Sequence, residues 1–221
     1  NININVPKFK TPKKTRFIKS KNHLLRIDDE NINFKLINKY KKIIIKKLDN
    51  EIKKNDLIIL SDYNKGLLDK NLIKKIIKIS IKYNKKIIAD PKKIDLSIYS
   101  NVDFLTPNYK EMTDAANKKL LNEKNLIEFG KSIIQNYKIK NLLITRSEKG
   151  MLLINTELTK KFKSNPKKVI DVTGAGDTVI AVLGLMLVLR FSVDDSIKIS
   201  NYAAGKVIGI NGTASLNFFD L

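Results

Sequence analysis

The chain has 221 residues, 43% of them hydrophobic, which is enough to bury the core of one substantial domain. It has no cysteine, so disulfides, thiolate metal sites and a cysteine nucleophile are excluded. Its longest apolar run, at residues 179–189, is shorter than the roughly 20 residues that a membrane-crossing helix needs. We therefore expect a globular, cytoplasmic protein that has no membrane partner.

The formal net charge of +21 raises the question of nucleic acid, because basic surfaces bind phosphates by releasing counterions. The lysines, however, are spread through almost every segment beside many isoleucines and asparagines, a pattern typical of A/T-rich coding sequence. The sequence contains no zinc-finger, homeodomain or RNA-binding motif and no platform of basic and aromatic residues. Nucleic acid is therefore not expected to be an evolved partner.

Residues 1–15 contain two prolines and are expected to form a loose or extended segment ahead of a domain at 16–221. At the start of that domain, residues 16–27 read as two short strands around a Lys-Asn turn, and acidic residues follow up to residue 30. This pattern predicts a flap or an edge hairpin. His23, the only histidine, lies in the hairpin and is assigned no role.

The rest of the chain alternates amphipathic helices with short apolar runs. Apolar residues at helical spacing predict helices over residues 34–48, 69–83, 126–137, 175–191 and 193–210. Apolar runs predict strands within residues 56–62, 86–91, 101–108 and 141–145, and antiparallel strands within 150–157 and 160–164. The alternation predicts an α/β domain whose mostly parallel central sheet is flanked by helices. Its ligand site should lie at the carboxyl ends of the strands.

The strongest motif is DVTGAGDTV at residues 171–179, directly before the most hydrophobic predicted helix. Glycines there allow backbone N–H groups to converge at a helix N-terminus, which favours phosphate or developing negative charge. The amides of Gly174, Ala175 and Gly176 can stabilise a transferred group, while Asp177 takes a proton from an attacking hydroxyl. The alternative is purely structural, with the glycines tightening a turn and Asp177 capping the helix.

The whole run resembles the carboxyl-terminal signature of the ribokinase family, also called the PfkB carbohydrate kinases. The sequence has no Walker A loop, the other common phosphate-binding motif. The resemblance implies a ribokinase-like fold with a small β lid, to which the hairpin at 16–30 would belong, and it implies ATP and Mg²⁺ as cofactors. The family's catalytic base is the aspartate after Gly-Ala-Gly, which is Asp177 here.

Residues 106–111, TPNYKE, resemble the family's Asn-x-x-Glu motif. The resemblance implies that Asn108 and Glu111 organise magnesium, water and nucleotide phosphates, with Tyr109 and Lys110 between them in the cofactor site. Glu111 is the expected metal ligand, because Mg²⁺ prefers hard oxygen donors and few carboxylates. Without the resemblance, the segment reads as a turn followed by a solvated helix.

Two later segments resemble the nucleotide-binding parts of the family. Residues 145–150, TRSEKG, look like the loop that contacts phosphates and ribose, which implies roles for Thr145, Ser147, Glu148 and Gly150. Residues 201–214 look like the closing segment, in which Asn201 and Ala204 would line the adenine pocket. Its Gly-Thr turn would help to bind a monovalent cation such as K⁺. As plain structure, these segments are a hairpin turn and a helix packed through small residues.

Residues 60–68 and 87–95 look like stretches of the D-glycero-β-D-manno-heptose 7-phosphate kinases, which phosphorylate the C1 hydroxyl in a pathway towards lipopolysaccharide. The implied sugar-site and transfer-path residues are Asp62, Lys65, Asp90 and Lys92. Asn64 and Lys93 replace glycines of that subfamily. No Gly-Gly sugar-binding motif precedes residue 15, so we expect an amino-terminally incomplete kinase domain.

The resemblance also implies a homodimer, since lids of this family often pair between subunits. Two alternatives remain open at the level of sequence. One is a kinase of the same family acting on another sugar. The other is a non-catalytic relic or basic binding module that retains nucleotide binding without turnover.

Overall fold

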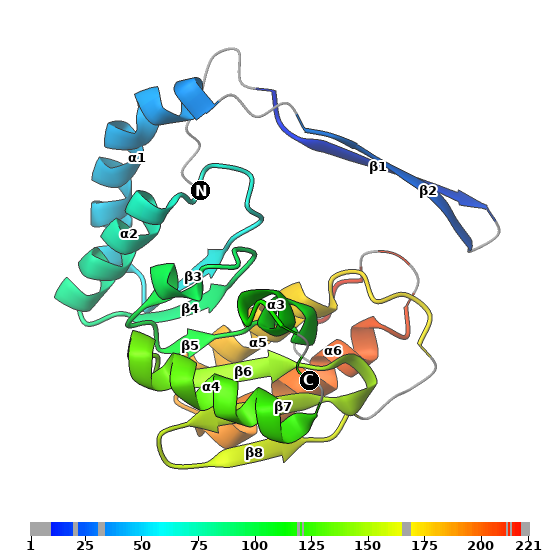
Figure 1. The fold of residues 1–221 in the computed structure, drawn as a ribbon. Helices are drawn as coiled ribbons and strands as arrows, with labels where there is room; N and C mark the ends of the chain where they lie inside the picture. Colours follow the sequence, from blue (N-terminus) through cyan, green and yellow to red (C-terminus); the bar gives the residue numbers. More distant parts are fainter. Residues whose placement is uncertain are drawn as a thin grey trace.

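The computed structural model describes residues 10–19, 22–30, 34–118, 120, 122–164, 169–210, 212 and 214–217. The main body is a three-layer α/β structure around one six-stranded sheet (Figure 1). The strands of this sheet are β3 (Leu57–Ser61), β4 (Lys86–Asp90), β5 (Phe104–Leu105), β6 (Asn141–Thr145), β7 (Met151–Asn155) and β8 (Thr159–Phe162). They lie side by side in sequence order. Those from β3 to β6 are parallel, and β7 and β8 are antiparallel, as the sequence predicts.

One face of the sheet is covered by helices that come early in the chain. These are α1 (Phe34–Lys54), α2 (Lys70–Lys82), α3 (Tyr109–Ala115) and α4 (Glu123–Tyr137), with the short 3₁₀ helix η1 (Leu96–Tyr99) beside them. Helix α2 begins where the Asp69 carboxylate accepts a hydrogen bond from the backbone of Leu72 at 2.8 Å. Its buried residues Leu72, Ile73, Ile76 and Ile77 follow the helical period and contact the sheet residues Ile87 and Ala89 within one apolar cluster.

The opposite face is covered by α5 (Ala175–Val188) and α6 (Val193–Val207), which lie behind the sheet in Figure 1. Alternate strand residues point to this side, because successive side chains in a strand face opposite ways. Ile88, Phe104 and Leu143 therefore form a second cluster with Leu183 and Ile197 from the two helices. Among the described residues, no helix is both long enough and apolar enough to cross a membrane.

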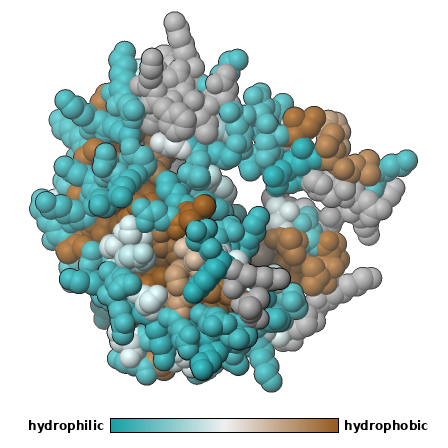
Figure 2. All heavy atoms as spheres, viewed as in Figure 1, coloured by the Kyte–Doolittle hydropathy of each residue, from teal (hydrophilic) through white to brown (hydrophobic). Residues whose placement is uncertain are grey.

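A separate two-stranded sheet projects from this body (Figure 1). It is formed by β1 (Lys13–Lys19) and β2 (Asn22–Asp29), which pair in antiparallel fashion. The first strand begins at Lys13, so the expected boundary of a loose segment at residue 15 lies within the hairpin. Phe17 pairs directly with Leu25, and both remain about half exposed, together with Leu24 and Ile27. Figure 2 shows these apolar residues as brown spheres on the projecting arm.

Some predicted elements differ in length from the observed ones. Helix α1 continues to Lys54, six residues beyond the predicted end, because Ile52 is buried in the core. Strand β5 has only two residues, since the chain turns away at Thr106 to begin the loop that leads into α3. Helix α5 ends at Val188, and Arg190 adopts a positive φ of 66° just after it. The order and type of the predicted elements are confirmed.

Candidate active site

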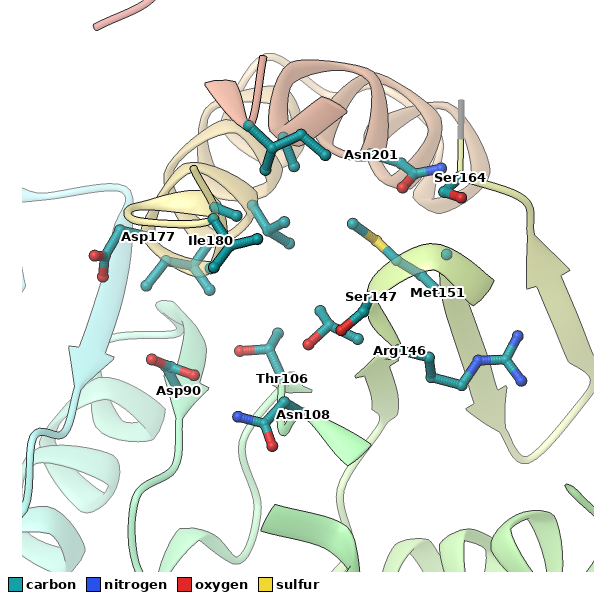
Figure 3. A pocket seen from close by; sticks show the side chains of 18 of the residues that line it. Asp90, Thr106, Asn108, Arg146, Ser147, Met151, Ser164, Asp177, Ile180 and Asn201 are labelled. Carbon is teal, nitrogen blue, oxygen red and sulfur yellow. The ribbon is translucent and has the colours of Figure 1, made fainter. Parts of the chain in front are cut away.

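A cavity of about 530 Å³ lies at the carboxyl ends of β4, β5 and β6, against α5 and α6. In Figure 3, Asp177 and Asp90 lie at one end of it and Asn201 and Ser164 at the other. The predicted site residues that line the cavity are Asp90, Lys92, Asn108, Glu111, Thr145, Ser147, Glu148, Gly150, Ala175, Gly176, Asp177, Asn201 and Ala204. The fold therefore brings together segments that are more than a hundred residues apart in the sequence.

The DVTGAGD motif forms the turn that starts α5. Gly174 has a φ of 82°, which favours glycine, and it is the N-cap of the helix. Asp171 fixes this turn because one carboxylate oxygen accepts from the backbone of Thr173 at 2.9 Å and the other from Gly212 at 3.2 Å. A Cβ added at Gly176 would meet no atom within 4 Å, so open space faces the first turn of the helix. Gly174 itself is not part of the cavity lining.

Four charged side chains and one tyrosine gather at the Asp177 end of the cavity. The Tyr63 hydroxyl donates a hydrogen bond to Asp177 Oδ1 at 3.0 Å. Burial raises the pKa of Asp90 to about 6; Lys92 opposes this rise, while the carboxylates of Glu111 and Asp177 add to it. Burial alone would lower the pKa of Lys92, but the hydrogen bond to Glu111 and the surrounding carboxylates outweigh it and raise that pKa.

The Asn-x-x-Glu segment is a capping box at the start of α3. The Asn108 side chain accepts from the Glu111 backbone at 2.9 Å, and Glu111 Oε2 accepts from the Asn108 backbone at 2.8 Å. The other Glu111 oxygen pairs with Lys92. Tyr109 points elsewhere, since its hydroxyl donates to the Leu120 carbonyl, and neither Tyr109 nor Lys110 lines the cavity. Within the described residues, no group of three or more acidic, histidine or cysteine side chains could hold a metal ion by itself.

The TRSEKG segment runs from the last residue of β6 through the 3₁₀ turn η2 (Ser147–Lys149) to Gly150, directly before β7. Thr145 bridges to Asn108, which places this loop beside the capping box. Gly150 has a φ of 72°, and a Cβ there would lie 2.0 Å from the Phe162 carbonyl oxygen. This glycine is therefore required by the fold as well as being part of the cavity wall. Arg146, which the sequence reasoning passed over, is buried and pairs with Glu123 at 2.8 Å.

The end of the cavity away from Asp177 has polar side chains as well as Met151 (Figure 3). Asn201 on α6 donates from its side-chain amide to the Lys163 carbonyl at 2.7 Å and so holds the chain after β8. The predicted Gly-Thr turn is described only in part, since Thr213 lies outside the described residues. The sequence reasoning did not single out the apolar wall, which consists of Met151, Val169, Val172, Val179, Ile180 and Ile208. Only the folded arrangement distinguishes these residues from ordinary core positions.

Two predicted sugar-site residues lie outside the cavity lining. Asp62 is only 2% exposed, and its carboxylate is bound by the Tyr99 hydroxyl at 2.7 Å, the Asn64 backbone at 2.7 Å and the Lys93 ammonium group. Lys65 forms an ion pair with Glu30 at the base of the hairpin. Lys93, which stands where the subfamily has a glycine, is the cation that compensates the buried Asp62 charge.

Comparison with known proteins agrees with this arrangement. Residues 6–217 match the family described as pfkB family carbohydrate kinase. The bifunctional protein HldE of Campylobacter fetus is 37% identical over 212 residues, which cover 96% of this chain and 45% of that protein. The bifunctional protein HldE of Aliarcobacter butzleri is 40% identical over 206 residues, covering 93% and 43% respectively. The chain thus spans less than half the length of these relatives.

Solved structures with a similar fold include phosphofructokinase-2 from Escherichia coli in complex with potassium. It has a TM-score of 0.71 and 19% identity, over 80% of this chain and 59% of that one. Ribokinase from Thermotoga maritima has a TM-score of 0.70 and 19% identity, over 92% and 65% of the two chains. These similarities confirm the predicted ribokinase-like α/β fold.

Proposed function

Because the chain belongs to the pfkB family of carbohydrate kinases, we propose that it transfers the γ-phosphoryl group of ATP to a sugar hydroxyl, with Asp177 as proton acceptor. The observation that carries this proposal is the position of Asp177. It stands in the first turn of α5, near Asp90, in a cavity that has both charged side chains and an apolar wall. Such a cavity offers an apolar place for a base and a polar place for phosphates and the acceptor hydroxyl.

The protein forms no covalent bond in the chemical step and acts by positioning the reactants and stabilising charge. The sugar oxygen forms a bond to the γ-phosphorus, its proton passes to the Asp177 carboxylate, and the bond between that phosphorus and the leaving ADP oxygen breaks. Backbone N–H groups in the first turn of a helix favour negative charge nearby, which supports a role for Ala175 and Gly176 beside the transferred group. The open space at Gly176 leaves room for that group.

We assign Mg²⁺ to the neighbourhood of Asn108 and Glu111. Their oxygens are hard donors, and Mg²⁺ usually takes one or two carboxylates and completes its coordination with phosphates and water. Few protein ligands are therefore needed, which fits a site without a preformed acidic cluster among the described residues. When bound, the ion would neutralise charge on the nucleotide phosphates. A monovalent cation is assigned to the neighbourhood of Gly212; K⁺ is the ion named for the phosphofructokinase-2 structure of similar fold.

We assign D-glycero-β-D-manno-heptose 7-phosphate as the acceptor, phosphorylated at its C1 hydroxyl. The support is the resemblance of residues 60–68 and 87–95 to such kinases and the similarity to two HldE proteins. Asp90 and Lys92 line the cavity beside Asp177 and suit contacts to the sugar or the transferred group. For Asp62 the contacts support a structural role, since its carboxylate is fully engaged within the protein.

We also propose that the chain forms a homodimer through the hairpin of β1 and β2. Three apolar side chains on this arm remain about half exposed: Phe17, Leu25 and Ile27. An apolar strand face of this kind is stabilised when a partner covers it. A second copy of the same hairpin offers a matching apolar surface.

The test is ADP release with magnesium-ATP and the heptose 7-phosphate, compared with fructose 6-phosphate and ribose. We expect turnover with the heptose, and we expect Asp177→Asn to lower kcat by at least about 10³-fold while ATP binding persists. The matched control is Asp114→Asn, an exposed aspartate on α3 that does not line the cavity. Turnover only with another sugar would refute the assigned acceptor, and ATP binding without any turnover would favour a non-catalytic relic.

A further inference from the structure

The hydrogen bond between Tyr63 and Asp177 joins two segments 114 residues apart. Tyr63 stands two residues after the end of β3 and is 53% exposed, and it lines the cavity beside Asp177. An exposed tyrosine needs no protein partner, because water can satisfy its hydroxyl. The hydrogen bond to Asp177 therefore indicates a role for Tyr63 in the site and not in the stability of the fold.

The backbone on both sides of Tyr63 is held firmly. On one side, the preceding residue Asp62 is fixed by Tyr99 and Lys93, and its backbone N–H donates to the Asp90 carbonyl at 3.2 Å. On the other side, Asn64 has a φ of 53° and donates its N–H to the Asp62 carboxylate. The side chain of Tyr63 thus extends into the cavity from an anchored turn.

The ionisation of Tyr63 suits a hydrogen-bond donor. Partial burial raises its pKa, as do the hydrogen bond to Asp177 and the negative charges of Asp177 and Asp90, while the Ser61 hydroxyl opposes the rise. The phenol therefore keeps its proton near neutral pH. It can donate to a carboxylate, but it does not compete with that carboxylate for the proton of an incoming hydroxyl.

We propose that Tyr63 is a positioning residue for the phosphoryl transfer, holding Asp177 by Oδ1 so that Oδ2 faces the sugar hydroxyl. The inference rests on the proposed role of Asp177 as proton acceptor. A carboxylate at a cavity mouth can rotate about its side-chain bonds, and one donor at a fixed place limits that rotation. Asp62 then serves the reaction indirectly, by anchoring the turn that carries Tyr63.

The kinetic test is Tyr63→Phe, which removes only the hydroxyl. We expect kcat to fall by about tenfold, the value typical of one hydrogen bond to a charged group, with the KM values for ATP and sugar unchanged. The matched control is Tyr83→Phe, which removes a tyrosine hydroxyl that donates to Asp49 at 3.2 Å outside the cavity. A wild-type kcat for Tyr63→Phe would overturn the proposal, as would a loss confined to the KM for the sugar.

A second test does not depend on activity. Absorbance titration of tyrosine ionisation, taken as the difference between the wild type and Tyr63→Phe, isolates Tyr63 among the seven tyrosines. With Asp177→Ala as the background, we expect Tyr63 to ionise at lower pH, because a hydrogen bond and a nearby negative charge have been removed. An unchanged titration would show that the contact is absent in solution and would overturn the proposal. If the titration shifts but the protein is inactive on every sugar, the contact between Tyr63 and Asp177 exists and the proposed kinase function is wrong.

Discussion

Asp90 is a partly buried carboxylate whose surroundings hold its pKa at about 6, above the ordinary value of 3.8. Burial is the main cause, and it disfavours the charged form. A shift of this size corresponds to a cost of at most about 3 kcal/mol once the group is ionised in the folded protein. Residues of functional sites often lower the stability of the folded protein in this way, because their positions suit the reaction and not folding.

We therefore expect Asp90→Asn to stabilise the free protein at neutral pH. A folded-state pKa above the unfolded one means that stability is lost as pH rises from about 4 to about 6. The amide does not undergo this loss. The free energy of unfolding in denaturant should increase by about 1–3 kcal/mol at pH 7.5, and the gain should disappear near pH 4. A gain that persisted at pH 4, or no gain at pH 7.5, would contradict this reading of Asp90.

The sequence could predict residues at this scale only where a motif marked them. Asp177 and Asn108 were found because each follows a strand or a glycine turn in a recognisable pattern, and both line the cavity. The contact between Tyr63 and Asp177 could not be predicted, because spacing within one segment carries no information about a partner 114 residues away. For Asp62 the sequence predicted a sugar-site role, whereas its carboxylate binds Lys93 within the protein. An aspartate at the end of a strand has the same sequence pattern in both cases.

At the scale of elements, Gly150 fixes how the strands after η2 pack. Its backbone passes so close to the end of β8 that a Cβ would lie 2.0 Å from the Phe162 carbonyl and 2.5 Å from the Ser164 nitrogen. Phe162 is paired with Met151 in the ladder of β7 and β8, so its carbonyl cannot move without disturbing that pairing. This proximity also shapes the cavity wall, to which both Gly150 and Ser164 contribute.

Gly150→Ala should therefore reduce the free energy of unfolding by about 3 kcal/mol or more, as measured by urea denaturation. Gly174→Ala provides the comparison, because Gly174 has a similar φ of 82° but no atom within 4 Å of an added Cβ. That variant should show only the conformational cost of about 1 kcal/mol. If the free energy of unfolding decreased equally in the two variants, the close contact at Gly150 would contribute nothing to the destabilisation.

Elements were predicted well wherever hydrophobic periodicity was long and uninterrupted. Helix α2 and strands β3, β4 and β6 match their predicted positions because each has a dedicated buried face. Strand β5 was predicted as a longer run, but its two residues suffice to pair with both neighbours. Apolar content alone cannot tell where such a strand stops and a buried loop begins.

At the scale of the whole molecule, the projecting hairpin separates two kinds of surface. Phe17 and Leu25 pair across the strands, and Thr15 with Ile27 follows on the same face, because side chains two residues apart share a side. Arg16 and Arg26 pair on the opposite face. One face of the arm thus has the apolar side chains of Phe17, Leu25 and Ile27, and the opposite face has the two arginines.

If the hairpin forms the dimer contact, Leu25→Lys should shift the protein from dimer to monomer, because it places a charge in the centre of the apolar face. Sedimentation velocity over a range of protein concentrations would measure the dissociation constant, which should rise at least about tenfold. Arg26→Gln, on the opposite face, is the control and should leave it unchanged. A monomeric wild type, or a dimer insensitive to Leu25→Lys, would exclude this contact.

The two faces of the sheet become covered at different times while the ribosome makes the chain. Each strand from β3 to β8 can dock on the one made just before it, and α1, α2 and α4 cover their face as they emerge. The other face, with Ile88, Phe104 and Leu143, is covered only by α5 and α6, which leave the ribosome after every strand of this sheet. Until then the nascent chain presents a broad apolar sheet, the kind of surface that chaperones bind and that aggregates when synthesis stalls.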